Sequence, residues 1–169
     1  MNSKRLVFIP VAAGAVLLDQ LGKLHATRTL EAGERSPLLG DVLALAHVPA
    51  ASGAFGIFRE LTPQAQLIGF ALLSIVSIAV IVLFYRGLAP RELGNAAALG
   101  AVLGGIASNT LDRLRYGFGI DFLHLGPIDA EGMPDFNLAD VSIVMGVVTL
   151  IVELLATEMA ARASERPRS

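Results

Sequence analysis

Two aspartates stand beside strongly apolar segments in the second half of the chain. Asp121 follows the glycine-containing stretch 117–120, and Asp140 opens a long apolar run. A charged carboxylate in a membrane-spanning helix costs about 2.5–3.5 kcal/mol, so a chain that keeps such residues usually needs them. Two carboxylates that meet in a poorly solvated site share one proton most easily, and such a pair can activate a water and polarise a carbonyl. We therefore predict that Asp121 and Asp140 face each other as a catalytic pair.

Polar side chains share helical faces near these aspartates. Asn137 lies three residues before Asp140, which places both on one face of a helix. The segment before Asp121 carries three polar residues at positions i, i+3 and i+4, which also share one face: Asn109, Asp112 and Arg113. Since only a short loop joins the two segments, we expect that Asp121 lies in this loop and that the chain brings the two aspartates together.

The composition excludes several other kinds of site. The chain contains no cysteine, which rules out thiolate nucleophiles, disulfides and cysteine-based metal sites. The net charge is -2 and no basic run is present, which argues against nucleic acid as a partner. The histidines have no ligand spacing, so we expect no metal and no other cofactor: His25, His47 and His124. We predict that His124 is incidental and that three loop acids are solvated: Asp129, Glu131 and Asp135.

The elements that must position these residues are membrane helices. Hydrophobic residues make up 54% of the chain and charged residues only 17%, with a mean hydropathy of +0.64, which is too apolar for an ordinary soluble domain. A span needs about 20 residues, so a chain of 169 residues can hold four. We predict an all-α membrane protein with a single domain over residues 1–169 and spans at about 6–26, 65–85, 93–114 and 138–160.

The first apolar segment looks like a secretory signal peptide but ends differently. Lys4 and Arg5 precede the apolar run, as in a signal peptide. No small-residue cleavage site follows, because the chain continues through Asp19 and Lys23 in helix-compatible residues, so we predict a retained helix. Asp19 and Lys23 lie four apart and can pair. The pair is either a helix-end ion pair with a snorkelling lysine or a support of the active site.

The segment from about residue 27 to residue 63 is polar and rich in Gly and Pro, and we expect it outside the cytoplasm. Residues 41–48 have strand-like side chains, and residues 50–58 combine small residues with aromatics. We predict a short strand and a Gly-rich turn that cradle an extended substrate. Lysines and arginines number seven on the predicted cytoplasmic side and six outside, a weak bias that places both termini in the cytoplasm. In the third span, Gly100 and Gly104 form a G-x-x-x-G pattern typical of close packing.

Three blocks of residues resemble the motifs of one family, in the same order. The blocks are Asp19-Gln20-x-x-Lys23, then Gly104-Gly105-x-x-x-Asn109-x-x-Asp112-Arg113 followed by Asp121-Phe122, and finally Phe136-Asn137-x-Ala139-Asp140. On these residues the chain resembles lipoprotein signal peptidase, also called signal peptidase II, a family of membrane aspartyl proteases. The resemblance runs from Asp19 to about Gly146.

The resemblance implies both an activity and a set of site residues. The family removes signal peptides from bacterial prolipoproteins, cutting just before a cysteine that carries a diacylglyceryl group. The implied catalytic pair is Asp121 and Asp140. The residues implied to bind substrate or orient the site are Asn109, Arg113, Asn137, Asp112, Asp19, Gln20, Lys23, Gly53 and Phe55. No metal or other cofactor is implied.

The resemblance also implies an architecture and a location. We expect four transmembrane helices with a small extracytoplasmic β-cradle, in the bacterial cytoplasmic (inner) membrane, with the active site at the extracytoplasmic face. The expected partners are the signal peptides of lipid-modified prolipoproteins and membrane lipids. We expect the protein to be a monomer.

The chain departs from the family pattern at two places. Ala50 and Ala51 stand where the family usually has an asparagine, and Ser108 replaces the glycine that commonly precedes Asn109. A lost amide removes a hydrogen bond of about 1 kcal/mol, so we expect altered affinity or substrate preference rather than lost chemistry. The alternatives are a catalytically altered paralogue that binds lipidated peptides, or a small carrier that uses aspartates as a proton relay.

Overall fold

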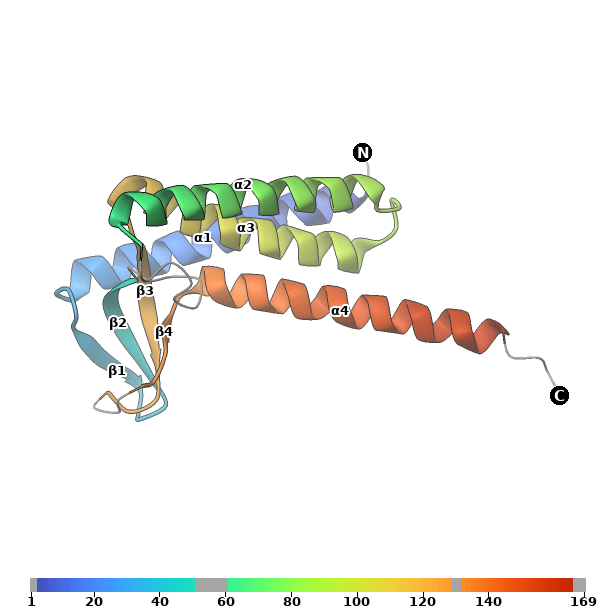
Figure 1. The fold of residues 1–169 in the computed structure, drawn as a ribbon. Helices are drawn as coiled ribbons and strands as arrows, with labels where there is room; N and C mark the ends of the chain where they lie inside the picture. The colour runs from blue at the N-terminus through green and yellow to red at the C-terminus, as the bar shows by residue number, and fades with distance from the viewer. Residues whose placement is uncertain (1–2, 51–60, 129–131, 166–169) are drawn as a thin grey trace.

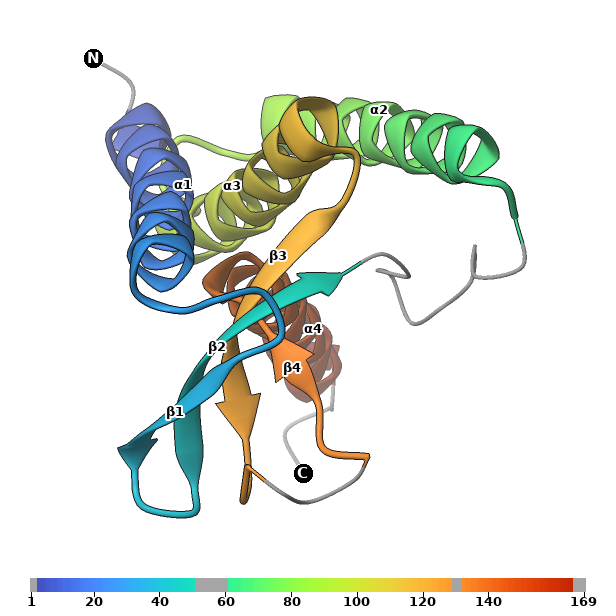
Figure 2. The same cartoon turned by 90° about the vertical axis from the view of Figure 1, so that its left-hand side faces the viewer.

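The computed structural model of the chain describes residues 3–50, 61–128 and 132–165, which form four long helices and a four-stranded sheet (Figure 1). The helices are α1 (Ser3–Thr29), α2 (Pro63–Gly87), α3 (Leu93–Tyr116) and α4 (Leu138–Glu165). The strands are β1 (Arg35–Leu39), β2 (Leu43–Ala50), β3 (Gly119–Leu125) and β4 (Asp135–Phe136). The helices run over the four ranges predicted as spans, and the sheet lies at one end of them (Figure 2).

The helix ends follow from local sequence. Thr62 caps α2 by accepting a hydrogen bond from the backbone N–H of Ala65, and Pro63 occupies the first turn, where its missing N–H costs nothing. α3 ends at Gly117, whose φ of 82° lies in the left-handed region that glycine adopts most easily. The chain can therefore turn sharply from α3 into the sheet.

α3 is the central helix of the bundle, because it contacts α1, α2 and α4. Adjacent glycines let two neighbours approach it closely. A Cβ on Gly104 would lie 2.5 Å from the backbone of α1, and a Cβ on Gly105 would lie 2.4 Å from the backbone of α4. The close packing predicted for Gly100 and Gly104 is confirmed, since a Cβ on Gly100 would also lie only 2.7 Å from α1.

Three helices are long and apolar enough to cross a membrane, by length and composition. They are Ser3–Thr29, Pro63–Gly87 and Leu138–Ala163, with mean hydropathies of 1.5, 2.9 and 2.2. Among the residues that the structure describes, α3 is not apolar enough to be counted with these three helices. It carries the polar residues Asn109, Asp112 and Arg113. The protein is therefore mostly helical with three candidate membrane spans and a small antiparallel sheet.

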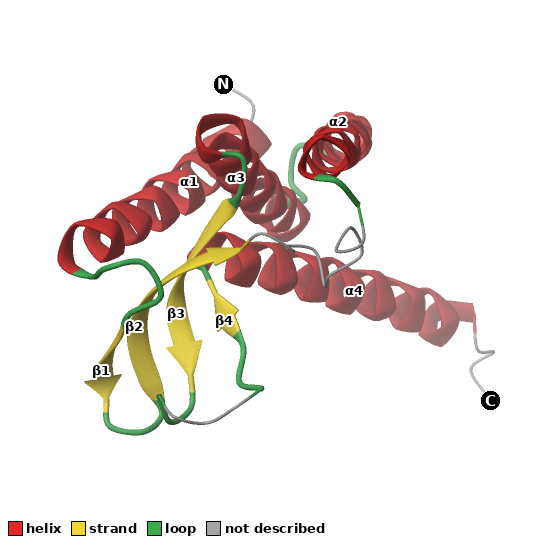
Figure 3. Cartoon of the chain, turned by 60° about the vertical axis from the view of Figure 1, so that its left-hand side comes forward, coloured by secondary structure: helices red, strands yellow, loops and turns green. Residues whose placement is uncertain are grey.

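The sheet is antiparallel with the strand order β1-β2-β3-β4 (Figure 3). The predicted strand at 41–48 is present as β2, but the sheet extends beyond the predicted range of 27–63, because β3 and β4 come from the segment after α3. The prediction that Asp121 lies in a loop is wrong, since Asp121 is in β3 and pairs with Val48 of β2. Its neighbours Ile120 and Phe122 are buried on the opposite face of the strand.

Two predictions about loop residues also need correction. His124 does not lie in a loop, because it is within β3, where it is only 1% exposed. Asp135 is not a solvated loop charge, because it lies in β4 and forms an ion pair with Arg35. The remaining loop acids and two of the expected site residues lie outside the described residues: Asp129, Glu131, Gly53 and Phe55.

Candidate active site

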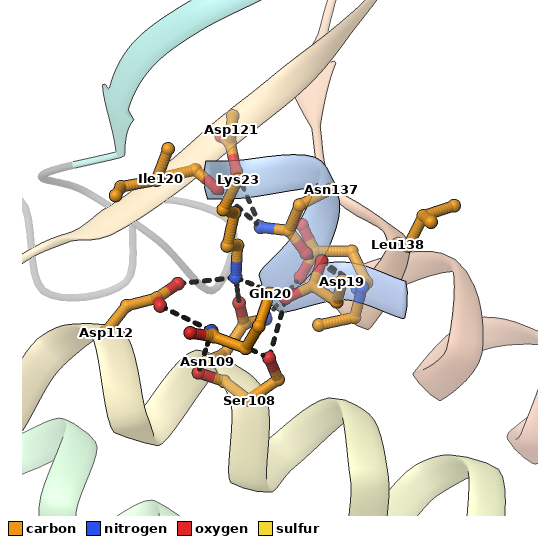
Figure 4. A network of polar contacts seen from close by, with 12 residues as sticks. Asp19, Gln20, Lys23, Ser108, Asn109, Asp112, Ile120, Asp121, Asn137 and Leu138 are labelled. Carbon is orange, nitrogen blue, oxygen red and sulfur yellow. Dashed lines mark hydrogen bonds and ion pairs between the residues drawn. The ribbon is translucent and has the colours of Figure 1, made fainter. Parts of the chain in front are cut away.

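A buried lysine lies at the centre of a polar network between α1 and α3 (Figure 4). Lys23 is only 3% exposed, and its Nζ lies 2.5 Å from the Asp19 carboxylate and pairs with Asp112. The same ammonium donates to Asn109 Oδ1 at 3.0 Å. The predicted Asp19–Lys23 pair is therefore present, and it lies in the protein interior rather than at a solvated helix end. A buried cation with two carboxylate partners is costly to disturb.

The carboxylate of Asp19 connects three helices. Its Oδ1 accepts the backbone N–H of Ala139, in the first turn of α4, at 2.8 Å. Its Oδ2 accepts the hydroxyl of Ser108 on α3 at 2.7 Å. Gln20 donates to Ser108 Oγ at 3.0 Å and to Asp112 Oδ1 at 2.7 Å. Ser108, which stands where the family pattern has a glycine, therefore takes part in this network through its hydroxyl.

Each of the two key aspartates is held by an asparagine. Asn137 donates to Asp121 Oδ1 at 2.8 Å and to the Ile120 carbonyl at 3.3 Å. Its own Oδ1 accepts the backbone N–H of Asp140 at 2.9 Å, which caps the start of α4. Asn109 donates from α3 to Asp140 Oδ1 at 2.8 Å. A strand and a helix from different parts of the fold therefore place the two carboxylates through fixed amides.

Both aspartates line one cavity of about 750 Å³ between the sheet, α2, α3 and α4. Asn109 and Arg113 line it as well. The rest of the wall is mostly apolar and includes side chains of all three helices: Phe70, Leu73, Ile106, Ile143 and Val144. A cavity with a few converging polar groups in an apolar wall is the usual form of a binding or catalytic site.

Arg113 reaches this cavity from α3. One of its terminal nitrogens donates to the Asn109 carbonyl at 3.0 Å, and its guanidinium lies over the ring of Phe70, 4.2 Å from the ring centre. Its Nε is buried without a hydrogen-bond partner among the described residues. Phe70, on α2, is a residue that the sequence did not single out. Nothing in the local pattern separates it from the lipid-facing side chains of the same helix.

The environment of Asp121 favours its protonated form. Burial raises the pKa of Asp121, and the negative charge of Asp140 raises it further, to about 6. The hydrogen bond from Asn137 and the charge of Lys23 act in the opposite direction but do not cancel the rise. One proton held near two carboxylates lets one group act as an acid while the other acts as a base.

The predicted site residues fall into two groups. Asp121, Asp140, Asn109 and Arg113 line the cavity. The others form a network of hydrogen bonds and ion pairs that contacts the cavity-lining residues: Asn137, Lys23, Asp19, Asp112 and Gln20. The arrangement can bind an extended chain with an apolar portion, and it can take a proton from water and give one to a carbonyl oxygen.

Known proteins resemble this chain in sequence and in fold. A family model described as "Signal peptidase (SPase) II" matches residues 11–156. A lipoprotein signal peptidase of Geobacillus kaustophilus is 33% identical over 144 residues, which is 85% of this chain and 90% of that protein. A lipoprotein signal peptidase of Halothermothrix orenii is 33% identical over 156 residues, which is 90% of this chain and 97% of that protein. A solved bacterial membrane enzyme shares the fold, with a TM-score of 0.79 and 24% identity over 96% of this chain and 93% of the other.

Proposed function

The chain belongs to the signal peptidase II family of aspartic peptidases, and from this premise we propose that Asp121 and Asp140 are its catalytic pair. The enzyme is a membrane protease that processes lipoproteins. The observation that supports the assignment is that both carboxylates line one cavity while a separate asparagine binds each of them. Two acids with fixed positions and different surroundings meet the requirement for acid and base roles.

The two aspartates take different roles in this proposal. We assign the proton that the pair shares to Asp121, because burial and the charge of Asp140 raise its pKa to about 6. We assign the role of base to Asp140, which lies in the first turn of α4, where the helix dipole favours a negative charge, and which accepts the amide hydrogen of Asn109. Asp140 takes a proton from a water, and the water oxygen attacks the scissile carbonyl carbon as Asp121 gives its proton to the carbonyl oxygen. The proton on Asp140 then moves to the leaving amide nitrogen as the C–N bond breaks, and Asp121 takes back a proton from one hydroxyl of the tetrahedral intermediate, which leaves the new carboxylic acid and restores both aspartates.

The substrate of this reaction is a prolipoprotein that carries a diacylglyceryl-modified cysteine, cut just before that cysteine. The apolar wall between α2 and α4 suits an acyl chain that reaches the site from the bilayer. Arg113 has an unpartnered buried Nε among the described residues, and it is suited to bind a peptide carbonyl beside the scissile bond. The roles of Gly53 and Phe55 stay predictions, because both residues lie outside the described part of the chain.

We also propose how the protein sits in the membrane. α3 is the fourth span, since the other three helices contact it and its polar side chains point into the bundle rather than to lipid. The sheet and the site lie at the extracytoplasmic face of the bacterial cytoplasmic membrane, and both termini lie in the cytoplasm, with Lys4 and Arg5 at the inner boundary. Membrane lipids surround the helices, and the enzyme works as a monomer.

The experiment uses the full-length protein in detergent micelles with a synthetic lipidated prolipoprotein, followed by mass spectrometry. The wild-type protein should produce the two fragments of a single cut before the lipidated cysteine. Asp121→Asn and Asp140→Asn should remain folded and produce none. Glu158→Gln, which removes an exposed ion pair with Arg162 far along α4, is the control and should cleave normally. Cleavage by either aspartate variant at the wild-type rate would reject the catalytic pair.

A further inference from the structure

A second group of charged side chains lies on the sheet, apart from the network around Lys23. Asp135 on β4 receives two hydrogen bonds from Arg35 on β1, Nε to Oδ1 at 3.1 Å and Nη2 to Oδ2 at 2.5 Å. His124 on β3 places Nδ1 at 2.9 Å from the same Oδ1, and its Nε2 lies 3.3 Å from the Pro127 carbonyl. We call these three residues, Arg35, His124 and Asp135, the strand cluster.

The strand cluster connects the two edge strands of the sheet. β1 and β4 are separated by β2 and β3, and the register places the three side chains on one face, since Arg35 pairs with Ala46 and His124 pairs with Ala44 and Asp135. The two alanines of β2 are buried and small. They leave room for the arginine to reach across the sheet.

The members of the cluster are polar, and Asp135 and His124 are largely enclosed. The side chain of Asp135 is 15% exposed and that of His124 is 2% exposed. Burial alone would raise the pKa of Asp135, but the hydrogen bonds from Arg35 and His124 outweigh it and hold that pKa below its ordinary value. Both ring nitrogens of His124 lie within hydrogen-bond distance of an oxygen, which fixes the orientation of the ring. A bidentate arginine–carboxylate pair fixes orientation as well as distance.

β4 links the strand cluster to the candidate active site along the chain. The strand contains only two residues, Asp135 and Phe136, and it pairs with β3 at two positions. Such a short strand has little backbone pairing to hold it. The next residue is Asn137, which donates to Asp121 and accepts the N–H of Asp140. The position of β4 therefore sets the position of the side chain that contacts both aspartates.

We propose that Arg35, His124 and Asp135 are positioning residues for catalysis, which fix β4 and thereby the placement of Asn137 between the two aspartates. The proposal rests on the assignment of Asp121 and Asp140 as the catalytic pair. It assigns a role in the reaction to residues that contact neither carboxylate by a hydrogen bond.

The first experiment compares Asp135→Asn and Arg35→Gln with wild type, using the full-length enzyme and a lipidated prolipoprotein. Each variant should lower kcat about tenfold while KM changes less than twofold, because the distortion affects the reacting groups and not the apolar wall. The double variant should be no slower than either single variant, since both remove one interaction. Glu158→Gln, at the exposed pair with Arg162, is the matched control and should keep wild-type kinetics. A rise in KM at constant kcat would identify Asp135 as a substrate contact and overturn the proposal, as would strictly additive effects.

A second measurement separates positioning from a loss of folded enzyme. The charged groups that act on Asp121 are Asp140 on α4, Lys23 on α1, Arg113 on α3 and Asp135 on β4. Asn137 lowers the pKa of Asp121 through its hydrogen bond, so displacing Asn137 in Arg35→Gln, which keeps the charge of Asp135, should move the ionisation near pH 6 in the kcat/KM profile to higher pH. Partial unfolding would lower the amount of active enzyme and leave the profile in place, and that result would overturn the proposal.

Asp121→Asn in the same assay distinguishes a wrong catalytic pair from a wrong positioning role. If Asp121→Asn cleaves normally, the catalytic pair itself is wrong. If Asp121→Asn is inactive while Asp135→Asn and Arg35→Gln have wild-type kcat and pH profiles, the pair stands and only the positioning role is rejected.

Discussion

The amide nitrogen of Asn109 lies 2.8 Å from Oδ1 of Asp140, and the amide oxygen of the same side chain lies 3.0 Å from the ammonium of Lys23. The lysine therefore fixes which end of the amide faces the carboxylate. A positive charge on α1 acts on Asp140 of α4 through one side chain of α3. This polarised hydrogen bond is the contact that we expect to keep Asp140 ionised and in place.

Replacing Asn109 by aspartate should remove the hydrogen bond to Asp140 without changing the size of the side chain. Asn109→Asp loses the donor and adds a negative charge beside Asp140, so kcat should fall about 100-fold, which corresponds to about 2.7 kcal/mol. Folding should survive, because Lys23 can pair with the new carboxylate. Asn95→Asp makes the same change at the start of α3 and should cleave at the wild-type rate. Equal rates for the two variants would contradict the role of Asn109.

Lys23→Met should destabilise the protein before it affects chemistry. The substitution leaves Asp19 and Asp112 as buried carboxylates without their shared cation, which costs about 3–5 kcal/mol. The measurement is the thermal unfolding temperature in detergent, with the yield of monodisperse protein as a second readout. Adding Asp112→Asn to Lys23→Met should restore part of the loss. A Tm equal to that of wild type for Lys23→Met would contradict the account of the network.

Asp121→Asn should be inactive and yet more stable than wild type at pH 8. The pKa of Asp121 is raised from 3.8 to about 6, so the folded protein binds this proton more tightly than the unfolded chain does. Its stabilising contribution is complete below pH 3.8 and is lost as the pH rises through about 6. Asparagine has no charge to bury, so the variant should gain about 1–3 kcal/mol at pH 8 and nothing near pH 3.5.

Asp135→Asn should show the opposite dependence in the same unfolding experiment. The pKa of Asp135 is held below its ordinary value, so its charge stabilises the folded protein at neutral pH and this contribution is lost as the pH falls. The variant should therefore unfold at a lower temperature than wild type at pH 8, and the difference should shrink in acid. If both aspartate variants moved Tm in the same direction at pH 8, the electrostatic description of one of them would be wrong.

Gly105→Ala should destabilise the contact between α3 and the start of α4, where Asp140 lies. The added methyl would lie 2.4 Å from the Ala139 carbonyl, so α3 and α4 must move apart, at a cost of about 1–3 kcal/mol. Activity should fall as well, because Asn109 and Asp140 lie on the two helices that separate. Gly14→Ala is the matched control, since nothing lies within 4 Å of its added methyl. It should leave cleavage unchanged and raise Tm slightly, because alanine favours helix over glycine.

Much of the helical architecture could be predicted because lipid imposes a simple requirement on sequence. Helices that face hydrocarbon need apolar side chains on almost every face, and the runs within α2 and α4 meet this requirement. α3 lacks such a run, since its small and polar residues reflect contacts with other helices. The order of the motifs predicted which residues gather at the site, and nine of the eleven named residues lie in the described part of the chain.

The part of the sheet that follows α3, and the strand cluster, were missed for a physical reason. Gly117 and Gly119 suggest a loop, and polar residues at Asp121 and His124 hide the alternation of β3. The partners Arg35 and Asp135 lie 100 residues apart, so their contact depends on strand register rather than on local pattern. The same holds for Ser108 and Asp19, whose hydrogen bond depends on how closely α1 and α3 approach.

The hydrogen bond between Asp19 and the N–H of Ala139 joins the first helix to the last one. A ribosome makes α1 early and α4 at the end, so the amino end of α4 meets its carboxylate partner only after nearly the whole polypeptide has been delivered to the membrane. A nascent chain that ends before residue 137 holds neither Asp140 nor the cap that Asn137 provides. On the proposed assignment of Asp121 and Asp140, the catalytic pair is therefore complete only once the ribosome has begun α4.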